Sequence, residues 1–240
     1  MSKLFGALEA LIDAPFARAG TTPAPRRIGS IYENITRKAA SHRVEQPTWL
    51  AMTTAATMTM SSPESLTPLH CMASAERLVT NAIKNAELMR EARLKCIGFN
   101  GVPRTINYLN AFRGSLPEEV GAGLTTQPSR TPSAGDIKRR GRALWDSIYR
   151  PFETKLVEKL AHSHPDLPVH IINSEYEAVA CLRAQTGAGP QVTSHLFGML
   201  KALDDGTWKD CMWILERVGN IVQAIGGSQG STFAPPRAKI

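Results

Sequence analysis

The side chain best suited to proton transfer is His195, which lies in an apolar segment, PQVTSHLFGMLKAL. An imidazole titrates near neutral pH and serves as a general acid or base. Glu175 and Glu177 begin the preceding helical segment, and either carboxylate could orient the ring if the two helices pack antiparallel. The alternative is a core histidine that is bonded to a backbone carbonyl. The sequence thus predicts either a proton relay at His195 or a structural residue.

The four cysteines are Cys71, Cys96, Cys181 and Cys211, and no two of them lie within four residues. This spacing excludes the CxxC redox motif and the tetrahedral zinc motifs. Cys96 and Cys211 fall on apolar helical faces, where a cysteine usually serves as a small core residue. Cys181 precedes His195 by one predicted helix and is the candidate reactive thiolate. Phosphate-binding and metalloprotease motifs do not occur in a supporting context, so no metal or organic cofactor is expected.

Most of the positive charge gathers in one region of the sequence. The chain of 240 residues carries a formal charge of +7, and residues 101–142 hold seven basic and three acidic side chains. The run KRRGR at 138–142 follows GAGLTTQPSRTPSAGD, whose composition is typical of a solvated linker. No aromatic residues interleave with the basic run, so it indicates a soluble flank and not a nucleic-acid partner.

The elements that must position these residues are helices, because apolar residues recur at helical spacing and no strand pattern occurs. Helical order appears before the linker and returns after it, and similar residues recur 117 to 127 positions apart, as in Tyr32 and Tyr149. We expect an all-α fold with two pseudo-repeated halves. The expected helices span 29–44, 49–60, 63–86, 88–99, 103–112, 143–162, 175–185, 190–203 and 208–225.

The predicted organisation is one helical domain with two flexible ends. An N-terminal arm covers 1–28, the domain covers 29–225 with halves 29–113 and 143–225 joined by linker 114–142, and a tail covers 226–240. The tail ends in Ala238, Lys239 and Ile240, a small, a basic and an aliphatic residue that resemble a peroxisomal address read by the import receptor. We therefore expect a peroxisomal protein, or otherwise a cytoplasmic or mitochondrial one. No apolar stretch approaches the ~20 residues needed to span a bilayer.

One part of the sequence resembles a known family. REARLKCIGFNGVPRTINYLNAF at 90–112 resembles the signature of the carboxymuconolactone decarboxylases and the wider alkylhydroperoxidase D-like superfamily. A helical glutamate is followed there by an aromatic residue and then Gly-x-Pro, here Glu91, Phe99, Gly101 and Pro103. FNGVPRTIN, WLAMTTAATMTMSSPESL and CLRAQTGAGPQVTSHLFGMLKA resemble a fungal branch of this superfamily whose activity is mostly uncharacterised.

The resemblance implies an alkylhydroperoxidase D-like helical bundle that assembles as a homo-oligomer. Peroxidase members carry CxxC before the histidine, but Ala188 and Gln191 stand at those places here, which argues against that chemistry. Decarboxylase members carry only the histidine, which corresponds to His195, with an upstream glutamate for which Glu177 is the nearest match and Glu175 the rival. The residues expected to hold a substrate are Asn100, Arg104, Arg183 and Gln191.

Three functions therefore remain open. The leading one is a lyase that acts on a small carboxylated or lactone substrate by histidine acid–base chemistry, without a cofactor. The second is a catalytically inactive oligomeric scaffold of the same fold. The third is thiol-dependent reduction of a hydroperoxide in oxidative-stress defence, through Cys181 or Cys96.

Overall fold

The computed structural model describes residues 21–75, 78–127, 134–163, 165, 168, 181–182, 184 and 207–226. These residues are mostly helical and contain no strand, which confirms the predicted all-α class. The helices are α2 (Ile28–Ser41), α3 (Gln46–Thr59), the short 3₁₀ helix η2 (Pro63–Ser65), α4 (Leu66–Ser74), α5 (Val79–Lys95), α6 (Ile97–Asn100), α7 (Val102–Ser115), α8 (Glu118–Ala122), α9 (Ala134–Tyr149), α10 (Glu153–Ser163) and α14 (Thr207–Gly226).

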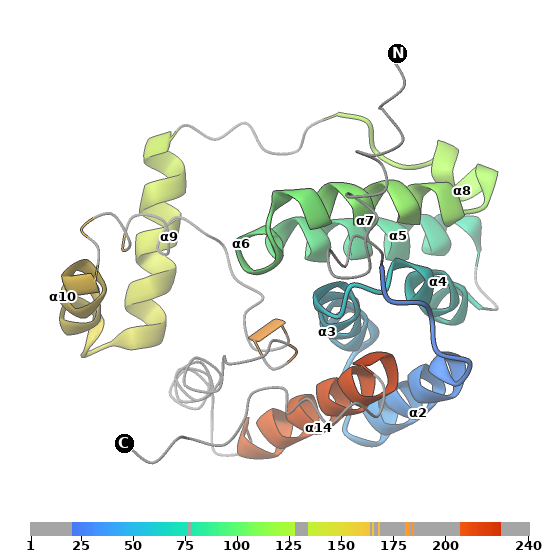
Figure 1. The fold of residues 1–240 in the computed structure, drawn as a ribbon, viewed down its shortest axis with the longest axis horizontal. Coiled ribbons are helices and arrows are strands. Elements are labelled where there is room, and N and C mark those ends of the chain that lie inside the picture. The colour runs from blue at the N-terminus through green and yellow to red at the C-terminus, as the bar shows by residue number, and fades with distance from the viewer. Residues whose placement is uncertain are drawn as a thin grey trace, which may run out of the picture.

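Helix α3 is the centre of the bundle and packs against α2, α4, α5 and α14 (Figure 1). Its sequence is rich in Ala, Met and Thr around the whole circumference, and every residue from Met52 to Thr59 is buried. A helix without a polar face is stable in water only when other helices surround it. Pro47 lies in its first turn, where the missing amide hydrogen costs no hydrogen bond.

The outer helices cover α3 with one apolar stripe each. Helix α2 buries Ile28, Tyr32, Ile35 and Ala39, at the spacing expected for one face of a helix. Helix α14 crosses beside it and buries Val218, Ile221, Val222 and Ile225. The Tyr32 hydroxyl and the Thr57 hydroxyl are 3.0 Å apart, a hydrogen bond that ties α2 to α3 inside the core.

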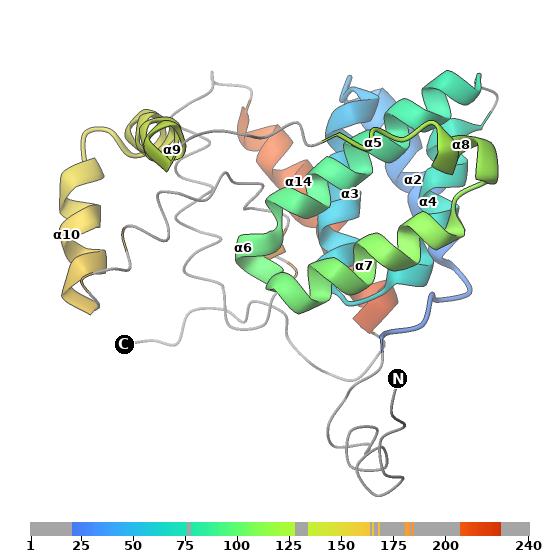
Figure 2. The same ribbon diagram turned by 90° about the horizontal axis from the view of Figure 1, so that it is seen from above.

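Helices α5, α6 and α7 form the side of the bundle that carries the candidate site (Figure 2). Helix α5 ends at Lys95 and α6 ends at Asn100, and the next residue, Gly101, has a φ of 81°, which lies in the region that favours glycine. Pro103 then lies in the first turn of α7. The Thr105 hydroxyl donates a hydrogen bond of 3.0 Å to the Gly101 carbonyl and fixes the turn. The sequence FNGVPRT is therefore a sharp reversal between two helices.

Three expected helices are in fact divided. The segment 88–99, predicted as one helix, holds the last turns of α5, which ends at Lys95, and the beginning of α6 at Ile97. The segment 63–86, predicted as one helix, is η2 and α4, followed by a break before α5 begins at Val79. The segment 143–162 was likewise predicted as one helix, but α9 ends at Tyr149 and α10 begins at Glu153. Pro151 lies between them, and proline cannot donate the backbone hydrogen bond that a continuous helix needs.

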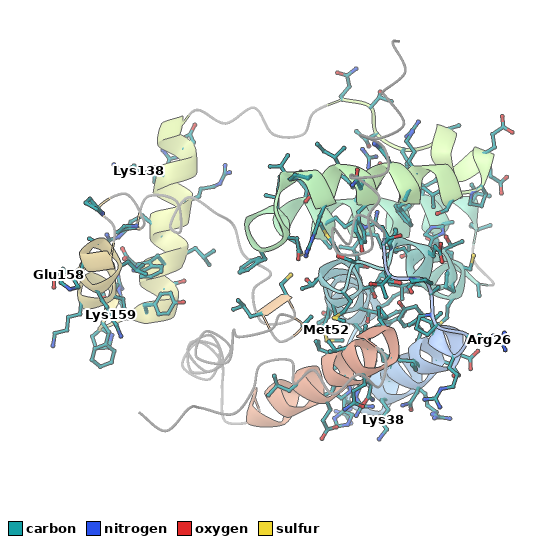
Figure 3. The ribbon with its side chains drawn as sticks, viewed as in Figure 1. Arg26, Lys38, Met52, Lys138, Glu158 and Lys159 are labelled. Carbon is teal, nitrogen blue, oxygen red and sulfur yellow. The ribbon has the colours of Figure 1, made fainter. Side chains whose placement is uncertain are left out.

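Part of the predicted linker 114–142 is also helical. Helix α8 and the first turns of α9 lie within it, so the basic run Lys138–Arg142 lies on a helix and not in an extended joint. Figure 3 shows Lys138 on α9 and Glu158 on α10, both on the solvent-exposed side of this helical pair. The Trp145 indole donates a hydrogen bond of 3.1 Å to the Glu153 carbonyl, which holds α9 and α10 together.

In the described ranges no helix has both the length and the apolar character that crossing a membrane requires. The predicted second copy of the helical unit includes 175–185 and 190–203, which fall almost entirely outside the described residues, so the two-half arrangement stays a prediction.

Candidate functional site

The sequence-predicted site residues divide into two groups. His195, Glu175, Glu177, Arg183 and Gln191 lie outside the described residues, as do Ala238, Lys239 and Ile240 of the predicted address. Asn100, Arg104 and Cys181 are described. Asn100 and Cys181 are buried, whereas Arg104 is exposed on α7.

The structure brings Asn100 and Cys181 together. The Asn100 amide nitrogen lies 4.0 Å from the Cys181 sulfur, although 81 positions separate the two in sequence. Asn100 ends α6 and is 8% exposed. Its side-chain carbonyl oxygen is buried and has no hydrogen-bond partner among the residues that are described. Because a buried acceptor of this kind is costly to leave unsatisfied, it indicates a place for a donor from elsewhere.

The residue that sequence analysis missed is Arg93 on α5. Its relative exposure is 0%, and it is the largest side chain in the fully buried set. It follows Ala86 and Met89 and precedes Cys96 at spacings of three and four, so it occupies a position of the apolar stripe of α5. The sequence signal for Arg93 is its place on an apolar helical stripe. Arginine is almost never fully buried unless it is paired, so an arginine at such a position indicates a special role.

Arg93 has no polar partner within the described part of the chain. All three guanidinium nitrogens are buried without a hydrogen bond. No Asp or Glu appears among the buried described residues, whose polar side chains other than Arg93 and Arg217 carry hydroxyl, amide, imidazole, indole or thiol groups. Arg217, in contrast, donates a hydrogen bond of 2.7 Å to the Glu216 carboxylate. Arg93 is therefore a buried cation without a counter-charge in these ranges.

An aromatic side chain of α7 contacts the guanidinium group, and further rings of α7 and α4 lie near it. Its central carbon lies 3.8 Å from the centroid of the Phe112 ring, a cation–π contact. The ring of His70, on α4, meets Phe112 edge to face with centroids 5.8 Å apart. Tyr108 lies one turn before Phe112, and its buried hydroxyl has no described partner at full hydrogen-bond geometry, although the Ser61 hydroxyl is near enough to lower its pKa. These contacts orient Arg93 but supply no negative charge.

The electrostatics agree with this geometry. Burial lowers the pKa of Arg93 to about 9, while Coulombic coupling to Tyr108 and Cys96 acts in the opposite direction. The guanidinium group therefore stays protonated at neutral pH. Burial raises the pKa of Tyr108, against smaller opposing effects of Ser61 and of the Arg104 and Arg93 cations. Burial also lowers the pKa of His70, and the Arg93 charge adds to that shift, so His70 is a neutral ring.

This set of groups is suited to an anion. A guanidinium group presents five N–H donors in a planar fork that matches the two oxygens of a carboxylate. The Tyr108 hydroxyl can donate a further hydrogen bond. His70 is already committed, because its Nε2 lies 3.0 Å from the Ala82 carbonyl oxygen. The described residues contain no group of three or more His, Cys, Asp and Glu side chains that could hold a metal ion.

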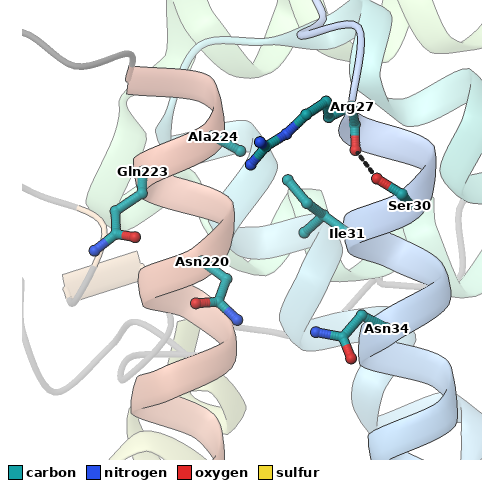
Figure 4. A pocket seen from close by; sticks show the side chains of 7 residues that line it. All are labelled: Arg27, Ser30, Ile31, Asn34, Asn220, Gln223 and Ala224. Atoms are coloured by element: carbon teal, nitrogen blue, oxygen red, sulfur yellow. Dashed lines mark hydrogen bonds between the residues drawn. The ribbon is translucent and has the colours of Figure 1, made fainter.

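A separate cavity lies between α2 and α14 and is open to solvent (Figure 4). Its volume is about 280 Å³, and it is lined by Arg27, Ser30, Ile31, Asn34, Asn220, Gln223 and Ala224. The Ser30 hydroxyl donates a hydrogen bond of 2.9 Å to the Arg27 carbonyl at one end of the cavity. None of these residues belongs to the Arg93 cluster, so the cavity is not the candidate site.

Comparison of the chain with family models, curated proteins and solved structures found no match.

Proposed function

We propose that this protein binds a small carboxylate-bearing substrate against Arg93 and acts on it by decarboxylase-like acid–base chemistry. The observation that supports the proposal is the fully buried Arg93 guanidinium group, which lacks an acceptor among the described residues. An unpaired buried charge costs several kcal/mol, roughly, and an anionic ligand offsets that cost. A fork of N–H donors favours a planar carboxylate over a monatomic anion.

In this proposal each group has a distinct role. Arg93 holds the substrate carboxylate, and the Tyr108 hydroxyl donates a second hydrogen bond to it. Asn100 offers its unsatisfied carbonyl oxygen to a substrate hydroxyl or lactone-derived donor. His195, the acid–base residue predicted from the sequence, transfers the proton, with Glu177 or Glu175 as its orienting carboxylate. The peroxisomal address, the homo-oligomer and the resemblance to the decarboxylase-like superfamily stay predictions of the sequence.

The first test measures binding with simple probes. The full-length protein is heated with benzoate, with succinate, and with benzamide, which has the shape of benzoate but no charge. A ligand at ten times its Kd stabilises a protein by about 1.4 kcal/mol, which is a rise in Tm of roughly 3–6 °C at this chain length. We expect this rise with at least one carboxylate, no rise with benzamide, and no response in the variant Arg93→Met.

An equal response to benzoate and benzamide, or a full response in Arg93→Met, would exclude carboxylate binding at Arg93. A chain that responds to none of the probes supports the inactive scaffold instead. The acid–base role is tested separately with His195→Gln, on whichever carboxylated lactone the protein turns over. His162→Gln is the matched control, because His162 is exposed at the end of α10. Full activity of His195→Gln would remove His195 from the mechanism.

A further inference from the structure

Two buried cysteines that are far apart in sequence meet beside the Arg93 cluster. The sulfur atoms of Cys96 and Cys181 lie 3.2 Å apart, although 85 positions separate the residues along the chain. Each side chain is 0% exposed. A disulfide bond has an S–S length of about 2.05 Å, so the two sulfurs must approach by roughly 1 Å to bond.

The surroundings of the pair favour thiolate chemistry. Arg93 precedes Cys96 by one turn of α5, and its cation is electrostatically coupled to Cys96. A neighbouring cation stabilises a thiolate, which is the nucleophilic form of cysteine. On the other side, the Asn100 amide group points toward the Cys181 sulfur at 4.0 Å. The pair thus has a cation in electrostatic contact with Cys96 and a hydrogen-bond donor directed at Cys181, which two cysteines that only fill an apolar core would lack.

We propose that Cys96 and Cys181 form a reversible disulfide when a hydroperoxide oxidises them. The Cys96 thiolate attacks the terminal peroxide oxygen and forms a sulfenic acid, while the other oxygen leaves and takes up a proton as an alcohol, or as water from hydrogen peroxide. The Cys181 sulfur then attacks the sulfenic sulfur, and hydroxide leaves and is protonated to water. In sum, two thiols and one hydroperoxide give one disulfide, one alcohol and one water. A dithiol reductant reverses the bond by exchange.

This site differs from the CxxC pair that the sequence lacks. The two cysteines come from separate segments, so the disulfide joins the C-terminal end of α5 to the helical residues 181–182. The inference does not depend on the carboxylate proposed for Arg93, because it rests on the sulfur–sulfur distance. Its test uses reduced full-length protein without any carboxylate, so that the two proposals can fail separately.

The sequence makes the bond easy to assign. Trypsin places the four cysteines in four different peptides, 44–77 with Cys71, 96–104 with Cys96, 160–183 with Cys181 and 210–217 with Cys211. Reduced protein is treated with one to five equivalents of hydrogen peroxide, blocked with iodoacetamide and digested without reductant. We expect 96–104 joined to 160–183 as the dominant cross-link, lighter by two hydrogens than the sum of the peptides, and lost on treatment with dithiothreitol.

Variants and stability give the second readout. Cys96→Ala and Cys181→Ala should each abolish the cross-link, whereas Cys71→Ala should leave it intact because Cys71 is exposed elsewhere on α4. A bond that closes a loop of this length should also raise the Tm of the oxidised wild-type protein by roughly 5–15 °C, reversibly. The digest of the oxidised wild-type protein tests for the Cys96–Cys181 cross-link even if a variant fails to fold. Separate alkylation of both cysteines after peroxide treatment, a sulfinic acid on either one, or a dominant cross-link through Cys71 or Cys211 would overturn the proposal.

Discussion

Replacing Arg93 by methionine should stabilise the ligand-free protein, although it removes a residue of the proposed site. Methionine fills a similar elongated volume without a charge. Burial lowers the pKa of Arg93 to about 9, well below the ordinary value of an arginine. At about 1.4 kcal/mol per pKa unit, the shift corresponds to roughly 5 kcal/mol against the charged form in the folded state. The unfolded chain holds this proton more tightly, so the penalty acts at every pH below about 9 and decreases only as the pH rises from there toward the ordinary pKa of arginine.

Part of this penalty is already offset by the contact with Phe112. A desolvated cation–π pair contributes about 1–2 kcal/mol, and Arg93→Met loses it. The net expectation is a gain of roughly 2–4 kcal/mol in the free energy of unfolding, since apolar replacement of a buried charge is often neutral or stabilising. Urea denaturation in a buffer free of carboxylate, phosphate and sulfate measures the gain. The accompanying rise in Tm should be roughly 5–15 °C.

Arg90→Met is the matched control for this experiment. Arg90 lies on the same helix, pairs with Glu87 at 3.1 Å and keeps 35% of its side chain exposed. An exposed pair of this kind contributes about 0–1 kcal/mol, so we expect a change within that range and no gain. If Arg93→Met instead lowers the free energy of unfolding by more than about 1 kcal/mol, the guanidinium group is already compensated in the folded chain, and the argument for an anion site at Arg93 is refuted.

The remaining predictions concern single groups around the site. Tyr32→Phe leaves the buried Thr57 hydroxyl without its partner and should lower the free energy of unfolding in urea by about 1–2 kcal/mol. Tyr108→Phe removes a hydroxyl that has no described partner at hydrogen-bond geometry, so it should lower that free energy by less than about 0.5 kcal/mol. The same variant should weaken the thermal response to benzoate. Equal costs for the two would show that the Tyr108 hydroxyl is bonded. Gly101→Ala should destabilise by about 1–3 kcal/mol, because φ of 81° with ψ of 158° is essentially restricted to glycine; an unchanged midpoint would contradict this backbone. Burial lowers the pKa of His70, so the unfolded state takes up its proton first and stability should fall as the pH drops below about 6.5. This loss should shrink in His70→Gln, and an unchanged pH profile between pH 5 and 7.5 would contradict a neutral buried ring.

The helices with a clear periodic signal were predictable from the sequence. The stripe of Ile31, Ile35 and Ala39 indicated α2, and the uninterrupted apolar character between Trp49 and Met60 indicated the buried α3. Both were placed within a few residues. The break between α4 and α5 was missed because no proline or glycine marks it. The break at Pro151 carried such a mark, but the regular spacing of leucines on both sides obscured it.

The site was less predictable, for a physical reason. The position of Arg93 on the stripe of α5 is a local pattern, so its burial could be read from the sequence. Its lack of a counter-charge depends on every element that packs around it, and no local pattern encodes that. The contact between Cys96 and Cys181 was even less predictable, because the two residues are 85 positions apart and the spacing rules used to exclude CxxC consider only nearby cysteines. Spacing rules can exclude a local sequence motif such as CxxC, but they cannot exclude a contact between cysteines that are distant in sequence.

The two proposals share one cation, so they are thermodynamically coupled. Arg93 stabilises either a substrate carboxylate or the Cys96 thiolate, and its single charge cannot fully neutralise both. A bound carboxylate would therefore disfavour the Cys96 thiolate and slow its attack on a hydroperoxide, while oxidation to the disulfide would remove the competing thiolate. Coupling of binding equilibria is reciprocal. The factor by which the Cys96 thiolate weakens carboxylate binding is therefore the same factor by which a bound carboxylate disfavours the thiolate. Binding of a carboxylate substrate would then lower the reactivity of the Cys96 and Cys181 thiols. The coupling would run through Arg93, which the proposed decarboxylase chemistry uses only to hold the substrate carboxylate.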